Sequence, residues 1–248
     1  MKILTISDQV ESALYDRFDS EQFDGIDLIL SCGDLPPEYL SFLLGKLNAP
    51  LYFVRGNHDF RHDSKTPPGC IDLNANLNKF EGINIFGLEG SRWYNGGPYQ
   101  YTEREMHWKI QRLRPRIWRM GGVDIVITHA PPRHIHDAED RCHKGFKSFR
   151  WFIDKYSPRY FIHGHIHANF TDPSQRVTII NQTQVINTFG YFLFDIEKGE
   201  IAESPTTRWA GGLDFSARGG KKQRHGSALI GAGVTVDTRA KHPVESTQ

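Results

Sequence analysis

Three consecutive side chains that follow Gly56 are of types that bind metal ions or transfer protons. Residues 51–54 are apolar and typical of a short buried strand, and Gly56 is followed by Asn57, His58 and Asp59. A strand that serves only the core is rarely followed by an amide, an imidazole and a carboxylate in a row. The segment therefore indicates a functional site at the end of a strand.

Four other predicted strands end in comparable groups. The five strands cover residues 2–6, 27–32, 51–54, 123–128 and 159–162, and the groups at their ends are Asp8, Asp34, Asn57, His129 and the pair His165 and His167. Sites in open α/β sheets form outside the carboxyl ends of strands, so the fold should gather these groups at one edge. Carboxylate, amide and imidazole ligands together suit a divalent ion such as Mn, Fe or Zn.

The elements that must position these groups are predicted from hydrophobic spacing. Further strands are expected over residues 83–88, 177–180, 185–188 and 191–196, and helices after Pro36, after Thr102 and over residues 145–156. Thr102 and Glu105 have the spacing of a capping box, and Pro115 should kink or divide the second helix. Residues 60–80 are polar, and Pro67-Pro68-Gly69 mark a loop within them.

Composition and charge limit the classes of function. The chain has 248 residues and a formal net charge of +1, but seven Lys/Arg against three Asp/Glu follow residue 204, so residues 1–204 carry about −3. A mildly acidic body argues against a nucleic-acid partner. Residues 1–204 are expected to form one domain, and residues 205–248 a Gly-rich, basic tail that is mobile or lies across its surface.

Cysteine use and hydropathy indicate the compartment. Three cysteines without metal-type spacing predict no disulfide framework and a reducing environment. We see no signal peptide and no apolar run of the ~18 residues that a membrane span needs. A cytoplasmic protein without a membrane partner is therefore expected.

The ordered strand ends resemble those of the calcineurin-like metallophosphoesterase family. The family pattern D-x-H, G-D, G-N-H-[DE], a single His and G-H-x-H is matched over residues 1 to about 200 by Asp8, Gly33-Asp34, Gly56-Asn57-His58-Asp59, His129 and Gly164-His165-Ile166-His167. The resemblance implies an α/β fold, an αββα sandwich of two mixed β-sheets flanked by helices. It also implies a centre of two divalent metal ions that activates a water molecule.

The resemblance assigns a role to each matched residue. Asp34 would bridge both ions, and His58 would act as the catalytic histidine beside the leaving oxygen. One ion would be held by Asn57, His129 and His165, and the other by Asp8 and His167. The chain departs from the family at Val10, where the first histidine should stand. We therefore expect a first metal site that is weaker or differently selective, because three protein ligands still suffice for catalysis.

Two segments could contact the substrate, and each has a plainer interpretation. Residues 134–145 crowd imidazoles and carboxylates next to His129, so Arg141, Lys144 or His143 could contact phosphate, or the segment could be a solvated loop. His136 or His143 could also replace the missing ligand. Arg55 could bind substrate or form an ion pair with Asp59. The aromatic side chains of the 90–101 loop could stack on a nucleoside or pack their own loop; they are Trp93, Tyr94, Tyr99 and Tyr101.

The predicted function is metal-dependent hydrolysis of a phosphomonoester or phosphodiester, with a small phosphorylated substrate as the partner. The alternative is a catalytically degenerate family member that serves as a binding or scaffold protein, since Val10 replaces a ligand. The presence of His58 favours catalysis, because a scaffold needs no leaving-group histidine. A nuclease would need a basic channel and would lose affinity steeply with salt.

Overall fold

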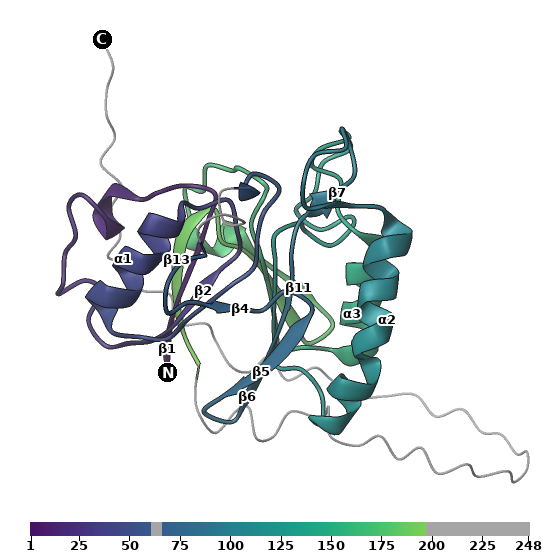
Figure 1. The fold of residues 1–248 in the computed structure, drawn as a ribbon, viewed down its shortest axis with the longest axis horizontal. Helices are drawn as coiled ribbons and strands as arrows, with labels where there is room; N and C mark the ends of the chain where they lie inside the picture. The colour runs from purple at the N-terminus through teal and green to yellow at the C-terminus, as the bar shows by residue number, and fades with distance from the viewer. Residues whose placement is uncertain (61–65, 197–248) are drawn as a thin grey trace, which may run out of the picture.

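The computed structural model describes residues 1–60 and 66–196, which form two large mixed sheets packed face to face with helices on both outer sides (Figure 1). The first sheet has the strand order β13-β1-β2-β3-β4. Its strands β1 to β4 are parallel and β13 is antiparallel to β1. The bounds are β1 Lys2–Ser7, β2 Ile26–Ser31, β3 Leu51–Phe53, β4 Ile71–Asp72 and β13 Gly190–Asp195.

The second sheet has the order β11-β12-β10-β9-β6-β5. Its four central strands are parallel, and the edge strands β11 and β5 are antiparallel to their neighbours. The bounds are β5 Asn76–Phe80, β6 Ile83–Leu88, β9 Ile125–Thr128, β10 Tyr160–His163, β11 Val177–Ile180 and β12 Thr183–Asn187. A small parallel pair joins β7 (Ser91–Arg92) to β8 (Gln100–Tyr101).

Among the described residues, helix α1 covers the outer face of one sheet, and α2 and α3 cover the outer face of the other (Figure 1). They are α1 Pro37–Leu47, α2 Glu103–Arg119 and α3 Lys147–Tyr156, with short 3-10 turns η1 at Ser12–Leu14 and η3 at Pro173–Arg176. The first helix begins at a proline, where the missing N–H costs nothing. The capping box of Thr102 and Glu105 is confirmed at the start of α2.

Alternating side chains along each strand supply two different cores. In β2, Leu28 and Leu30 point between the sheets, whereas Ile29 packs towards α1. In β10, Ile162 lies between the sheets and Phe161 packs beneath α2 and α3. Strands buried on both faces in this way need near-continuous apolar sequence, as residues 27–32 have. The four-layer αββα sandwich is thus confirmed.

The elements differ from the predictions in two places. Helix α2 runs without division through Pro115, because its apolar stripe of Met106, Ile110 and Ile117 is buried against the sheet on both sides of the proline. The loop predicted at residues 67–69 is confirmed, but the polar segment also contains two strands that were not predicted, β4 and β5. The predicted tail from residue 205 lies outside the described residues. Within the described part, no helix is long and apolar enough to cross a membrane.

Candidate metal centre

The carboxyl ends of strands from both sheets meet at one place and bring the predicted ligands together. Asp34 follows β2 of the first sheet, and His129 and His165 follow β9 and β10 of the second. One potential ligand atom from each of these three residues lies within 4.8 Å of the others. The amide oxygen of Asn57, after β3, lies 3.0 Å from Nε2 of His129. Four of the predicted ligands therefore form one group.

Unusual backbone conformations aim three of the ligands. Asp8, Asp34 and His165 have φ values of 64°, 58° and 68°, in the left-handed region that non-glycine residues rarely adopt. Such conformations persist only where the surrounding structure enforces them, and they are concentrated at functional sites. Here the backbone N–H of Asp8 donates to the carbonyl of Gly33 at 3.1 Å, which ties the end of β1 to the end of β2.

The contacts of His129 bring three hydrogen-bond acceptor atoms to face one another. Its Nδ1 lies 2.8 Å from the carbonyl of Cys32, so Nδ1 carries the proton. Its Nε2 then faces the Asn57 amide oxygen and, at 3.3 Å, a carboxylate oxygen of Asp34. The Asn57 amide is held in this orientation because its NH₂ donates to the Tyr94 hydroxyl at 3.2 Å. Three acceptor atoms that converge in this way need a cation or a proton between them, so the residues fit a metal ion.

In the absence of metal, the same contacts perturb both charged partners. Burial would lower the pKa of His129, but the adjacent Asp34 carboxylate and its hydrogen bond outweigh burial and raise that pKa to about 9. Burial would raise the pKa of Asp34, and His129 lowers it to about 2. A proton on His129 thus occupies the position that a metal ion would take.

His165 is oriented in the same manner as His129. Its Nε2 lies 2.8 Å from the carbonyl of Cys142, which leaves Nδ1 free to bind an ion. Burial, together with the charge of His129, lowers the pKa of His165 to about 4, so the ring stays neutral as a ligand requires. The two carbonyl partners were not predicted, because any residue type can supply a backbone carbonyl.

The two remaining predicted ligands, Asp8 and His167, form a second pair. His167 Nε2 lies 3.4 Å from a carboxylate oxygen of Asp8, and the hydrogen bond to Asp8 raises the pKa of His167. The His167 ring also stacks on Phe189 with 4.7 Å between ring centroids. Val10, where the family has a histidine, is 38% exposed.

His58 and Asp59 have different roles in the Gly56–Asp59 turn. The His58 side chain is exposed, while its backbone N–H donates to Asp34 at 2.8 Å. The buried Asp59 carboxylate accepts backbone N–H groups of Asp34 at 2.7 Å and Gly56 at 2.8 Å. Asp59 therefore holds two strand ends in register beneath the centre.

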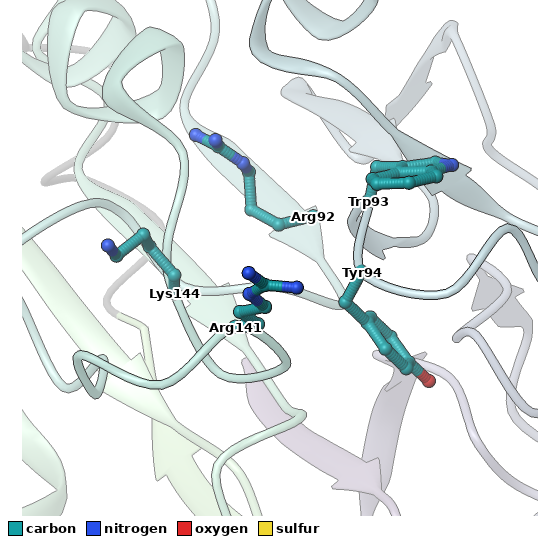
Figure 2. Close-up of a pocket in the computed structure, with 5 residues that line it drawn as sticks. All are labelled: Arg92, Trp93, Tyr94, Arg141 and Lys144. Atoms are coloured by element: carbon teal, nitrogen blue, oxygen red, sulfur yellow. The ribbon is translucent and has the colours of Figure 1, made fainter.

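The predicted substrate contacts are placed in three different environments. Tyr94 and Arg141 line a pocket of about 360 Å³ together with Arg92, Trp93 and Lys144 (Figure 2). His143 pairs with Asp140 at 3.0 Å, and its ring centroid lies 5.3 Å from that of His165. Arg55 pairs with Asp72 at 2.5 Å and lies 3.6 Å from Glu89, so it supports the loop from outside this pocket, with a partner other than the expected Asp59.

His136 does not replace the missing ligand. Its Nδ1 lies 2.9 Å from Nε2 of His163, and its Nε2 lies 2.8 Å from the hydroxyl of Thr178. Both ring nitrogens therefore have hydrogen-bond partners outside the candidate ligand set. Burial lowers the pKa of His136 to about 4, so this pair of histidines is neutral and connects the 134–145 segment to β10 and β11.

Comparison with known proteins agrees with this geometry. The family model described as calcineurin-like phosphoesterase matches residues 1–169. The solved structure of TT1561 from Thermus thermophilus is 16% identical, with a TM-score of 0.58, and the match covers 78% of this chain and 93% of that one. A novel archaeal phosphodiesterase is 16% identical, with a TM-score of 0.41 and coverage of 80% and 95%. No match was found among curated proteins.

Proposed function

Because the chain belongs to the calcineurin-like phosphoesterase family, we propose that it is a metal-dependent phosphoesterase that hydrolyses a phosphomonoester or phosphodiester of a small phosphorylated substrate. The convergence of the Asp34, Asn57 and His129 acceptor atoms carries this proposal. A protein that only binds a partner would not need three acceptor atoms that face one another, because a hydrogen-bonded pair of a donor and an acceptor costs less free energy to bury.

The residues divide into two groups around Asp34. Asn57, His129 and His165 would hold one divalent ion, and Asp8 and His167 the other, with Asp34 between them. When bound, a pair of divalent ions neutralises phosphoryl charge and lowers the pKa of a water molecule near them. The carbonyls of Cys32 and Cys142 keep both imidazoles in the tautomer that can bind a cation.

In this proposal, His58 acts on the leaving group. Its backbone is fixed to Asp34, yet its ring is exposed and can reach a substrate that enters from solvent. A protonated imidazole at this position would donate a proton to the departing oxygen. The buried Asp59 holds the turn that carries His58, so the ring is presented from a rigid base.

The proposal includes unequal metal sites. The site with His129 would have Asn57 and His165 as further ligands besides the shared Asp34, whereas Asp8 and His167 lack the histidine that Val10 replaces. We expect the purified protein, loaded with excess Mn and then desalted, to retain one ion tightly. Two ions of equal affinity would contradict this part of the proposal.

The test of function is Mn-dependent hydrolysis of bis(p-nitrophenyl) phosphate. We expect turnover in the native protein, none above background in His165→Ala, and native turnover in His107→Ala, which changes an exposed histidine on α2. The absence of turnover with Mn, Fe, Zn and Mg would overturn the proposal and favour the scaffold alternative.

A further inference from the structure

A pocket lies beside the candidate metal centre, and the hydrolysis proposed above assigns no role to the residues that line it. It has a volume of about 360 Å³ and is lined by Arg92, Trp93, Tyr94, Arg141 and Lys144 (Figure 2). This volume is at the small end of the range for ligand pockets, roughly 300–1,000 Å³. Two loops build it, one that continues from β7 and one that follows β9.

Three of the five residues that line the pocket are cationic, and two of them have acidic partners. Arg92 is paired with Glu103 at 2.7 Å, and Lys144 lies 3.6 Å from the exposed Glu139. Arg141 makes no ion pair with any residue in the part of the chain that the structure describes. Figure 2 shows its guanidinium between Lys144 and Tyr94. A guanidinium offers two parallel N–H donors to a phosphate, so the pocket suits a phosphate group.

The same pocket presents an aromatic surface. Trp93 is 58% exposed and has no ring contact with another described aromatic side chain. Figure 2 shows the indole directed away from Arg141 and Lys144, so it lines the same pocket at some distance from the cations and offers a face on which a nucleobase can stack. Cations and an open indole in one pocket fit a ligand that carries both a phosphate and a base.

Both walls of the pocket are attached to the metal centre. On one side, the Tyr94 hydroxyl accepts a hydrogen bond from Asn57 at 3.2 Å. On the other side, the carbonyl of Cys142, the neighbour of Arg141, lies 2.8 Å from Nε2 of His165. A single small substrate can therefore occupy the pocket and the metal centre together.

We propose that this pocket is the recognition site for a nucleoside that carries a second phosphate besides the scissile one. Arg141 binds the second phosphate, with Arg92 and Lys144 adding positive charge, and Trp93 stacks on the base. This inference rests on the proposed phosphoesterase function and adds the class of substrate. It makes Arg141 and Trp93 the residues that determine specificity.

A pair of matched chromogenic substrates tests the second phosphate. Thymidine 3′-(4-nitrophenyl phosphate) is compared with the same compound bearing a 5′-phosphate. We expect kcat/KM of the native protein to be about tenfold higher with the 5′-phosphate, as charge-assisted hydrogen bonds to one group would give. Arg141→Gln should bring this ratio close to one, while Arg119→Gln, an arginine at the end of α2, should keep it. A native ratio near one, or a ratio unchanged in Arg141→Gln, would overturn the inference.

A binding measurement separates this inference from the proposed activity. Thymidine 3′,5′-bisphosphate is titrated calorimetrically into the protein in EDTA, so that no metal contributes. We expect binding that is weakened about tenfold by Arg141→Gln and by Trp93→Leu, but not by Trp118→Leu, which changes a tryptophan that is 74% exposed on α2. Such binding without turnover would refute the activity and support the pocket. Turnover without such binding, or equal affinity for inorganic phosphate, would refute the nucleoside site alone.

Discussion

At the residue scale, Gly56 packs directly against two candidate metal ligands, so a side chain at this position would push against them. A Cβ atom built on it would overlap the Asp34 carboxylate and lie 2.7 Å from Cε1 of His129. Both neighbours are buried or nearly so and are held by hydrogen bonds, so they cannot move aside without loss. We expect Gly56→Ala to lower the free energy of unfolding by about 1–3 kcal/mol and to weaken Mn binding. Urea denaturation in EDTA and calorimetric titration with Mn measure the two effects.

Gly45 provides the matched control. It lies inside α1, and an added Cβ would meet no atom within 4 Å. Gly45→Ala should therefore raise the free energy of unfolding by about 0.5–1 kcal/mol, because alanine loses less backbone entropy in a helix. Equal behaviour of the two alanine variants would show that Gly56 is not tightly enclosed.

The sequence predicted the candidate ligands because each of them is a carboxylate, amide or imidazole side chain that follows an apolar strand. It could not predict what orients them. His129 and His165 are held by the carbonyls of Cys32 and Cys142, and a carbonyl carries no information about residue type. Arg92 was missed for a different reason, since a single arginine in a loop is common on any surface.

At the scale of elements, the sequence predicted buried strands better than edges. Among the strands that the structure describes, β5 at Asn76–Phe80 lies at the edge of its sheet beside β6. Of its five residues only Leu77 is buried, so its sequence resembles that of a loop. For α2 the prediction erred in the opposite direction. Pro115 was expected to kink or divide this helix, and the helix is not divided. Proline costs a helix about 3 kcal/mol, but the buried stripe of this helix continues on both sides and outweighs that cost.

Helix α3 depends on a cap from another helix. Its N-cap residue, Phe146, has no side-chain hydrogen bond, and the carboxylate of Glu103 in α2 instead accepts the N–H groups of Lys147 at 3.0 Å and Ser148 at 2.6 Å. We expect Glu103→Ala to lower the free energy of unfolding by about 0.5–2 kcal/mol, as loss of a cap does. Urea denaturation measures this, with the exposed Glu21→Ala as control, for which a change within about 0.5 kcal/mol is expected. Equal losses in both variants would contradict the capping role.

At the scale of the whole molecule, buried histidines make the metal-free protein sensitive to acid. Burial lowers the pKa of His136 to about 4, whereas an unfolded histidine titrates near 6.5. The unfolded state therefore binds more protons between these values, and the stability contributed by neutral His136 is present above pH 6.5 and is lost as the pH falls towards 4. His129, whose pKa is raised to about 9, contributes in the opposite sense, and its share is lost as the pH rises through 9.

We expect the urea midpoint of the EDTA-treated protein to be highest near neutral pH and to fall between about pH 6.5 and 4.5. His136→Gln should reduce this fall, because the glutamine does not titrate, and His107→Gln on the exposed face of α2 should leave it unchanged. A midpoint that stays constant over this range would show that the buried histidines are already charged in the folded protein.

The candidate metal centre also joins the two sheets, which pack against each other through apolar side chains of the central core and are linked by polar contacts such as the 2.6 Å hydrogen bond from the Thr188 hydroxyl to the Thr5 hydroxyl. Asp8, Asp34 and Asn57 come from the first sheet, and His129 and His165 from the second. An ion held by both should stabilise the whole sandwich by about 2.7 kcal/mol at a hundredfold excess over its dissociation constant. We expect Mn to raise the unfolding temperature of the native protein and of His107→Ala, EDTA to reverse the rise, and His165→Ala to show little of it. Because the ligands come from both sheets, the rise in unfolding temperature should appear in one cooperative transition. A separate transition at lower temperature that does not change with Mn would contradict this. It would mean that the sheets unfold independently and that the ion binds to one of them alone.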